Sequence, residues 1–587
     1  MSKTEIKASS DPAYLEKMRH TLAHVLAQAV TELYGHVKLG VGPTVEHGFY
    51  YDMDLDKKLG PDDLAKIEEK MREIVKRDLS MEREEVARAD ALKRVKKMDQ
   101  PYKVDIINDL PEDAVISFYT QGDFVDLCRG NHVDSTGQVG AFKLDKVAGA
   151  YWRGDDKNKM LQRVYGLAFA SEAELKAHLK MMEEAEKRDH RKLGKDLDLF
   201  VFSDLVGPGL PLWTPKGTLM RNLLDDYVWS LREAKGYQKV EIPHITKKDL
   251  YEKSGHWDKF KDELFKIQTR EGHTFAMKPM NCPHHTQIYA RTQHSYRDLP
   301  QRYANTTVVY RDEQTGELSG LSRVRSITQD DAHVFCRASQ AKEEILKVWD
   351  IVEEFYGSFG FKLKVRLSLS DPAHPEKYLG TRQMWDKAED ELRTIARGKK
   401  ADFSESLGEA AFYGPKVDFM SQDSIGRPWQ VATVQLDVNM PERFDLSCIN
   451  EKGEKERIVM IHAAIMGSIE RFVSVLIEHF AGALPVWMSP VQVALLPVSV
   501  QFNEFAGEIA AKLRAAGLRV EIDAGDDTVG KKIRAAEKLR TPYMIVLGEK
   551  EKSGEALAVR VRGQKDMPSL SLEDFVKRLQ KEVAGKK

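Results

Sequence analysis

The stretch VVYRDEQTGELSGLSRVRSITQDDAHVFC, residues 308–336, is the most informative part of this 587-residue sequence. Two strand-like runs flank a glycine-containing loop, with Arg311 and Glu313 before it and Arg323 and Arg325 after it. The pattern alone is typical of a charged antiparallel hairpin. Arginine's planar fork also suits phosphates, and a nearby carboxylate can accept a hydrogen bond from an exocyclic amine. Both interpretations, a structural hairpin and a phosphate site, stay open at this point.

Further along the chain, GSIERFVSVLIE predicts a helix with Arg471 in its first turn. A cation there opposes the helix dipole and therefore invites an anionic partner. Cys282, His333 and His462 are soft metal ligands, but they are widely separated in a chain with 17 histidines, so spacing does not group them. The chain contains neither a GxxxxGK[ST] phosphate loop nor a GxGxxG dinucleotide fingerprint.

The N-terminal part has a second candidate site. The sequence predicts a helix over residues 15–33, in which His20 and His24 share one face, almost opposite the apolar stripe. A surface or core histidine pair is the simplest interpretation, although the neighbours are small rather than charged. The later segment DLCRGNH places Cys128 and His132 four residues apart after a strand. These four side chains could bind zinc or activate water, and spacing does not decide between the two.

The sequence divides into three globular units and a linker. Residues 1–170 mix helix and strand, 171–195 predict a charged linker helix, 196–487 form a central block with an apolar helix near 463–480, and 488–587 alternate strand and helix as in a small α/β domain. The net charge is -2 overall, but the part from Val491 onward has 18 Lys and Arg against 14 Asp and Glu. This basic part is a candidate polyanion-binding unit.

The composition excludes several classes of protein. No run of 18 apolar residues exists, so we expect no membrane contact. The first residues lack the apolar region of a secretory signal. Four scattered cysteines do not make a disulfide framework, so we expect a cytoplasmic protein. These cysteines are Cys128, Cys282, Cys336 and Cys448.

From about residue 11 onward the sequence resembles the class II aminoacyl-tRNA synthetases, specifically the threonyl-tRNA synthetase family. The motifs that carry the resemblance are KVEIPHI, MKPMNCP, VYRDE with GLSRVR and TQDDAHVFC, FYGPKVDF and MIHAAIMGSIERF. RHTLAH and DLCRGNH match that family's editing domain. The resemblance implies an α+β editing domain over 1–170, a linker helix over 171–195, a class II catalytic domain with a six- or seven-stranded antiparallel sheet over 196–487, and an α/β anticodon-binding domain over 488–587. It also implies a homodimer, with Pro243 at the interface.

The same resemblance implies ATP-dependent activation of L-threonine and its transfer to tRNA(Thr). The catalytic arginines would be Arg311 on the α-phosphate and Arg323 and Arg471 on the γ-phosphate, with Mg²⁺ accompanying ATP. Glu313 would accept from the adenine amine, and Gln430 and Thr433 also match ATP-binding positions.

For the amino acid, the resemblance implies one Zn²⁺ per subunit, held by Cys282, His333 and His462. Threonine itself would lie among Gln329, Asp331, Tyr413 and Gln435. Valine lacks the hydroxyl that zinc would bind, whereas serine lacks only a methyl group, worth roughly 1–3 kcal/mol, and therefore requires editing.

Two further sets of residues follow from the resemblance. The editing site, which would hydrolyse seryl-tRNA, comprises His20, His24, Lys103, Asp126, Cys128 and His132, and we favour metal-free hydrolysis. The anticodon-reading residues are Arg534, Glu551 and Arg560.

The sequence departs from the family pattern at three places. His284 replaces a glycine beside Cys282, and we expect it to crowd or support the zinc. Asp526 and Thr528 stand in a loop where a lysine is usual, which questions anticodon contact there. We also expect the chain to lack the small ubiquitin-like N-terminal domain of many relatives. Two rival interpretations are a non-catalytic paralogue that binds tRNA-like RNA and a ligase for serine or proline.

Overall fold

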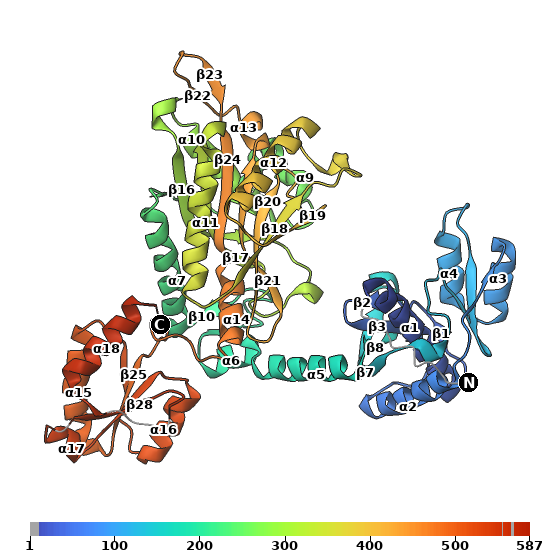
Figure 1. Cartoon of the computed structure of the whole chain (residues 1–587), viewed down its shortest axis with the longest axis horizontal. Helices are drawn as coiled ribbons and strands as arrows, with labels where there is room; N and C mark the ends of the chain where they lie inside the picture. The colour runs from blue at the N-terminus through green and yellow to red at the C-terminus, as the bar shows by residue number, and fades with distance from the viewer. Residues whose placement is uncertain (1–10, 555, 565–568, 587) are drawn as a thin grey trace. The chain divides into compact units, whose positions relative to one another are not determined.

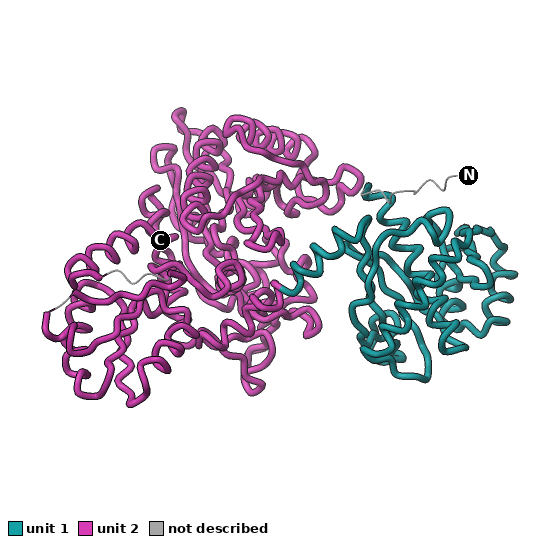
Figure 2. Tube along the Cα trace, turned by 60° about the horizontal axis from the view of Figure 1, so that its bottom comes forward, with its two compact units in different colours: residues 1–183 teal, residues 184–587 magenta. Residues whose placement is uncertain are grey.

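The computed structural model describes residues 11–554, 556–564 and 569–586, and the chain divides into two compact units, residues 1–183 and 184–587 (Figure 2). The division falls inside helix α5 (Glu172–Lys187). Where the sequence predicts one linker helix over 171–195, the structure has α5 and a separate helix α6 (His190–Asp196). The second helix starts because the Asp189 side chain accepts a hydrogen bond from Arg191 N and caps it. No helix in the described ranges is long and apolar enough to cross a membrane.

The first unit is α+β, as predicted. Helices α1 and α2 cover an antiparallel sheet in the order β1-β3-β8-β7, with β2 paired to β3, and a smaller sheet β4-β5-β6 lies with α3 and α4 (Figure 1). The bounds are α1 Pro12–Tyr34, β1 Lys38–Leu39, β2 Thr44–Val45, β3 Gly48–Asp54, α2 Pro61–Arg77, β4 Glu82–Glu85, α3 Arg88–Lys97, α4 Pro101–Asp109, β5 Ser117–Gln121, β6 Phe124–Leu127, β7 Ala141–Tyr151 and β8 Met160–Phe169.

Helix α1 is buried on more than its apolar stripe. Leu22, Val25 and Leu26 are fully buried in the core of this unit, and His24 on the other side is only 2% exposed. The histidine face of α1 is therefore covered at His24. Of the two simple interpretations of the histidine pair, surface or core, the surface interpretation is wrong for His24. Each fully buried aliphatic side chain contributes about 1.5–3 kcal/mol to folding.

The second unit is built on an eight-stranded sheet in the order β11-β16-β17-β24-β21-β20-β18-β19. Its six inner strands are antiparallel, while the short edge strands β11 and β19 pair in parallel with their neighbours, so the sheet exceeds the expected six or seven strands. The bounds are β11 Gln238–Lys239, β16 Gln301–Tyr310, β17 Ser326–Cys336, β18 Leu363–Leu369, β19 Phe403–Leu407, β20 Lys416–Gln422, β21 Pro428–Asp437 and β24 Val459–Ser468.

Helices α7 (Pro215–Glu233), α11 (Ala341–Gly357) and α14 (Ile469–His479) cover this sheet (Figure 1). Alternate residues of β17, Ala332 and Val334, pack into the same core as α7 and α11. The apolar segment near 463–480 is helical only from Ile469, because residues 459–468 form β24 and its β-sheet pairs on both sides.

The C-terminal part has the predicted α/β alternation. Strands β26, β25 and β27 are parallel, β28 and β29 continue the sheet antiparallel, α15 and α18 pack on one face, and α16 packs on the other (Figure 1). The bounds are β25 Val493–Pro497, α15 Asn503–Ala515, β26 Val520–Ile522, α16 Val529–Lys538, β27 Tyr543–Leu547, α17 Glu549–Lys552, β28 Leu557–Val561, β29 Ser569–Leu570 and α18 Leu572–Ala584.

Candidate active site

The sheet of the second unit brings together three side chains that sequence spacing did not group. His333 of β17 lies directly opposite His462 of β24, and Cys282 begins helix α10 (Cys282–Tyr289). One donor atom from each lies within 4.8 Å of the others, and all three residues are buried. A buried cluster of one thiol and two imidazoles is suited to zinc.

Hydrogen bonds connect the imidazoles of this cluster with one another and with a buried carboxylate. His462 Nε2 donates to the buried Asp437 Oδ2 at 2.9 Å, which leaves Nδ1 unprotonated. His333 Nε2 lies 3.1 Å from that Nδ1, and His333 Nδ1 lies 2.8 Å from His285 Nδ1. A neutral imidazole nitrogen and a thiol that can lose its proton are metal ligands, so the residues present fit a metal ion.

Burial raises the pKa of the Cys282 thiol well above its usual range, and Asp331 and Asp437 act in the same direction. Burial, with His462 and His285 nearby, lowers the pKa of His333 well below its usual range. Without a bound cation the cluster therefore favours a neutral thiol and a neutral imidazole. A divalent cation would favour the thiolate instead, since metal binding releases the thiol proton.

Three of the predicted threonine-binding residues, Asp331, Tyr413 and Gln435, lie next to this cluster. Along β17 the alternation of side chains places Gln329, Asp331 and His333 on one face. Asp331 Oδ2 accepts from Asn281 Nδ2 at 3.0 Å, and its Oδ1 lies 3.8 Å from His333 Nε2.

Tyr413 and Gln435, from β21 and the segment before β20, lie beside His462. The Tyr413 ring stacks on His462 at 4.8 Å, and its hydroxyl donates to Gln435, the cross-strand neighbour of His462.

The adjacent Asp330 faces the other side of the sheet. It is fully buried, pairs with Arg232 at 3.1 Å and accepts from the backbone N–H groups of Ile465 and Met466. Burial raises its pKa to about 6. Two neighbouring aspartates therefore have separate surroundings: Asp331 lies beside His333, whereas Asp330 holds the sheet to α7.

The three predicted catalytic arginines differ in their contacts and in their exposure to solvent. Arg311 packs over the Phe260 ring at 5.0 Å, and its Nε has no hydrogen-bond partner among the described residues. Arg471 lies 5.6 Å over the Trp429 ring in the first turn of α14. Burial lowers the pKa of both guanidinium groups. Arg311 is half-buried, whereas Arg471 is exposed. The buried, unpaired Nε–H of Arg311 is suited to an incoming phosphate oxygen.

Arg323 instead binds two carboxylates. Its Nη2 lies 2.6 Å from Glu313 and 3.2 Å from Glu317, and about half of its side chain is exposed. Arg323 and Glu313, which were predicted to bind different parts of ATP, are therefore paired with each other in this structure.

Gln430 and Thr433 belong to a polar network that the sequence did not reveal. Both donate to Asp418 Oδ1 at 2.9 Å, and the fully buried Asp418 also accepts from Arg366 and Lys416. Asp418 lies inside the FYGPKVDF stretch, but a lone aspartate in a strand carries no spacing signal.

The neighbours of Cys282 include one histidine that sequence reasoning missed. His256 Nε2 lies 3.5 Å from Cys282 Sγ and its Nδ1 lies 2.8 Å from Ser254 Oγ. It is His285, rather than His284, that contacts His333. Both ring nitrogens of the buried His284 are without a hydrogen-bond partner in the described part of the chain, and its ring packs 6.0 Å from Tyr251.

In the first unit, the two predicted histidines of α1 meet the loop that follows β6. Cys128 Sγ lies 3.3 Å from both His20 Nε2 and His132 Nε2, and the His20 and His132 rings stack at 4.2 Å. His24 completes the set, and donor atoms of all four lie within 4.8 Å of one another. Burial raises the pKa of Cys128 to about 11 and lowers the pKa of His20. The cluster can hold a metal ion or position a water molecule.

Lys103 and Asp126 lie beside this cluster. Lys103 Nζ is 2.7 Å from Asp126 Oδ1, and His24 Nε2 is 3.9 Å from Asp126 Oδ2. Sequence reasoning missed Tyr51 of β3, which donates to Asp126 and accepts from Lys103 at 3.0 Å. A lone tyrosine in a strand gives no signal, because only the fold brings it to the site.

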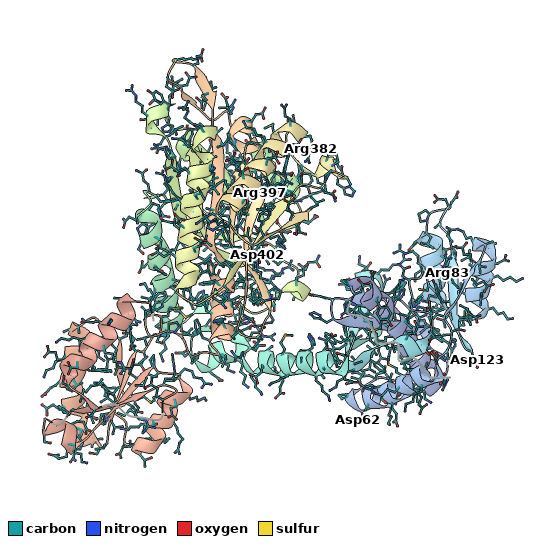
Figure 3. All side chains as sticks on the ribbon, viewed as in Figure 1. Asp62, Arg83, Asp123, Arg382, Arg397 and Asp402 are labelled. Atoms are coloured by element: carbon teal, nitrogen blue, oxygen red, sulfur yellow. The ribbon has the colours of Figure 1, made fainter. Side chains whose placement is uncertain are left out.

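These groups line a pocket of about 1020 Å³ within the first unit. Arg83 of β4, labelled in Figure 3, lies at the same pocket and adds a cation to its lining. The pocket is large enough for a nucleotide-sized ligand.

The predicted anticodon residues lie on three elements of the C-terminal domain. Arg534 is exposed on α16, and Arg560 of β28 lies opposite Met544 with its guanidinium 3.9 Å from Glu537 of α16. Glu551 accepts from Gly548 N at the start of α17. The structure thus places Arg560 beside α16, whereas Glu551 is engaged in capping a helix.

Three family comparisons match different parts of the chain. Residues 265–480 match the tRNA synthetase class II core domain (G, H, P, S and T), residues 492–582 match the anticodon binding domain, and residues 116–165 match the second additional domain of threonyl and alanyl tRNA synthetases.

Individual relatives match over nearly the full length. The chain is 49% identical to threonine–tRNA ligase of Acetivibrio thermocellus, covering 97% of this chain and 88% of that protein, and 47% identical to threonine–tRNA ligase of Clostridium tetani, covering 99% and 90%. A crystal structure described as the RNA binding domain of threonyl-tRNA synthetase from Cryptosporidium parvum Iowa II superposes with a TM-score of 0.64 at 36% identity, covering 67% of this chain and 98% of that one. With this near-complete match and the predicted synthetase motifs in place, the chain belongs to the threonine–tRNA ligase family.

Proposed function

We propose that this protein activates L-threonine with ATP, transfers it to tRNA(Thr), and hydrolyses mischarged seryl-tRNA(Thr), acting as a cytoplasmic homodimer with Pro243 at the interface. The observation that carries the proposal is the convergence of Cys282, His333 and His462 with Asp331 at one end of the catalytic sheet. In this proposal, residues 1–170 form the editing domain and residues 171–195 the linker. Residues 196–487 form the catalytic domain, and residues 488–587 form the anticodon-binding domain.

In the activation step, the threonine carboxylate attacks the α-phosphorus of ATP and pyrophosphate leaves. Arg311 would hold the α-phosphate, because its buried Nε–H is unpaired. Arg471 would hold the γ-phosphate from the start of α14. Such preorganised charges act on the transition state at little reorganisation cost, and Mg²⁺ bound with ATP would neutralise further phosphate charge.

Binding of ATP would also rearrange the ion pair between Arg323 and Glu313. Glu313 would accept from the adenine amine and Arg323 would turn to the γ-phosphate, while Gln430 and Thr433 would contact ATP from the network around Asp418. The exposed side of Arg323 gives it room to turn.

For threonine selection, Cys282, His333 and His462 would hold one Zn²⁺, which would supply a Lewis acid for recognition of the substrate amine and hydroxyl. Asp331 would accept a hydrogen bond from that hydroxyl, and Gln329, Tyr413 and Gln435 would close the pocket. Valine offers no hydroxyl and would leave the buried Asp331 without that hydrogen bond, which a polar site rejects strongly.

Serine keeps both groups, so its exclusion falls to the first unit. His20, His24, Cys128 and His132 would position a water molecule on the ester of seryl-tRNA, with Lys103 and Asp126 stabilising the charge that develops. We favour hydrolysis without a metal. Treatment with a chelator should then abolish threonine activation while seryl-tRNA hydrolysis continues, and loss of both activities would contradict the metal-free route.

Reading of the anticodon would involve Arg534, Glu551 and Arg560. Thr528 replaces the usual lysine just before α16, so we expect no charged contact from that position.

The decisive experiment is ATP–pyrophosphate exchange with threonine, serine and valine as separate substrates. We expect exchange with threonine and serine and very little with valine. A non-catalytic RNA-binding paralogue would give no exchange with any amino acid, and a ligase for proline would leave threonine inactive; either result would refute the proposal.

A further inference from the structure

Arg323 is the last residue of a tight turn, residues 319–323. Within it, Ser319 N donates to Arg323 O at 3.2 Å and Arg323 N donates to Ser319 O at 3.4 Å. Leu321 is fully buried in the core of the catalytic domain. A contact that fixes the position of this turn therefore also fixes the backbone of Arg323.

The turn is held at its centre by one imidazole. His190, the first residue of α6, is 4% exposed, and its Nε2 accepts a hydrogen bond from Leu321 N at 3.0 Å. His190 Nδ1 lies 2.6 Å from Glu478 Oε1 of α14, and His190 N also donates to that oxygen at 3.1 Å. His190 thus joins three separate segments: the linker, the helix that carries Arg471, and the turn that carries Arg323.

The tautomer of His190 follows from these partners. A backbone N–H can only donate, so Nε2 must be the unprotonated nitrogen and Nδ1–H must donate to the Glu478 carboxylate. Asp189, His190 and Glu478 also lie close enough together to suggest a metal site. Both ring nitrogens of His190 are already used, however, so the cluster is built for hydrogen bonding.

We propose that His190 is a positioning residue for ATP, which fixes the 319–323 turn so that Arg323 reaches the terminal phosphates. The inference rests on the proposed role of Arg323 in ATP binding. It concerns a residue that contacts neither substrate and lies in a segment whose sequence predicted only a solvated linker.

Gly320 gives this contact a second, independent constraint. Its φ of +51° is one that side chains rarely adopt, and a Cβ added there would lie 2.3 Å from His190 Nε2. The turn is therefore packed directly against the imidazole, with no room for even a methyl group between them.

Two substitutions separate the two nitrogens of His190. In His190→Asn the amide nitrogen lies where Nδ1 was and can still donate to Glu478, but nothing accepts from Leu321 N. In His190→Gln the amide oxygen lies where Nε2 was and can accept from Leu321 N, while Glu478 keeps the backbone N–H of residue 190. The pair is matched in polarity and differs in which hydrogen bond survives.

The measurement is ATP–pyrophosphate exchange, with ATP and threonine varied separately and thermal unfolding recorded for each variant. We expect His190→Asn to raise the KM for ATP about tenfold, the size of one lost hydrogen bond to a buried N–H, and His190→Gln to stay within about threefold. The KM for threonine should stay unchanged in both. Gly320→Ala should raise the KM for ATP in the same direction.

Equal effects of Asn and Gln on the KM for ATP, or an equal rise in the KM for threonine, would reduce His190 to a structural role and overturn the inference. An unchanged KM for ATP in Gly320→Ala would do the same. Absence of exchange in the unmodified protein would instead refute the proposed function, so the two failures are distinguishable.

Discussion

Asp437→Asn tests the proposed zinc site without replacing any of the three proposed zinc ligands. Asp437 is fully buried; its Oδ2 accepts from His462 Nε2 at 2.9 Å, and its Oδ1 accepts from Asn439 N and Met440 N at 2.8 and 2.9 Å. An asparagine can keep the two backbone hydrogen bonds with its oxygen. Its NH₂ group then faces His462 Nε2, where the carboxylate stood.

The substitution should reverse the tautomer of His462. Two N–H groups cannot face each other, so the imidazole proton moves to Nδ1, the nitrogen directed at His333 and Cys282. That proton must be displaced before a metal can bind. Loss of such a supporting partner typically lowers metal affinity about 10- to 100-fold, which is about 1.4–2.7 kcal/mol.

The assay is zinc binding by competition with a chromophoric chelator, followed by exchange kinetics at saturating zinc. We expect weaker zinc binding and a higher KM for threonine with an unchanged KM for ATP. Asp423→Asn is the matched control for zinc binding, since Asp423 is also buried and also accepts backbone N–H groups, from Ile425 and Arg427, but it does not contact the three ligands. Zinc affinity equal to that of the unmodified protein would refute the reasoning.

Three further outcomes are expected. Arg471→Ala should lower kcat for exchange by about 10²–10³-fold, as removal of a preorganised charge does, and an effect under threefold would remove Arg471 from the phosphate clamp. The double variant His20→Ala with Cys128→Ala should let seryl-tRNA accumulate in charging reactions while threonine activation stays near normal; undiminished seryl-tRNA hydrolysis would place editing elsewhere. Arg232→Ala leaves Asp330 buried without its cation and should destabilise the protein by about 3–5 kcal/mol in thermal unfolding. That penalty should shrink as the pH falls, because protonation removes the charge, and a penalty independent of pH would contradict it.

The fold could be predicted best where local pattern and final structure agree. The strand and helix alternation predicted for residues 488–587 agrees with β25, α15, β26, α16, β27 and β28, since each strand there is short and bounded by clear turns. The short helix α17 between β27 and β28 was not predicted. The interruption between α5 and α6 was missed, because a single aspartate within a charged stretch looks like part of the helix.

The sites could be predicted only in part from the residues themselves. His20 and His24 share a helix face, and that local relation is visible in the spacing. His333 and His462 are 129 positions apart, and only the register of β17 against β24 brings them together. Their grouping came from the resemblance to a family.

The residues that were missed have one feature in common. Tyr51, His256, Asp418 and His190 each belong to a segment whose local pattern is ordinary, and each becomes part of a site through long-range packing. His190 is the extreme example, since its charged neighbours predicted a solvated face, while α14 and the 319–323 turn bury it.

The alternation along β17 limits how this protein can vary. Because successive side chains point to opposite faces, deleting or inserting one residue before Asp331 would exchange the places of Asp330 and Asp331. The proposed threonine site would then contain Asp330 in place of Asp331, and Arg232 would lose its ion pair with Asp330. Changes in length are therefore tolerable only where a loop can absorb them, such as residues 314–318 between β16 and β17, and a library for altering substrate choice should vary side chains within β17 while keeping its length constant.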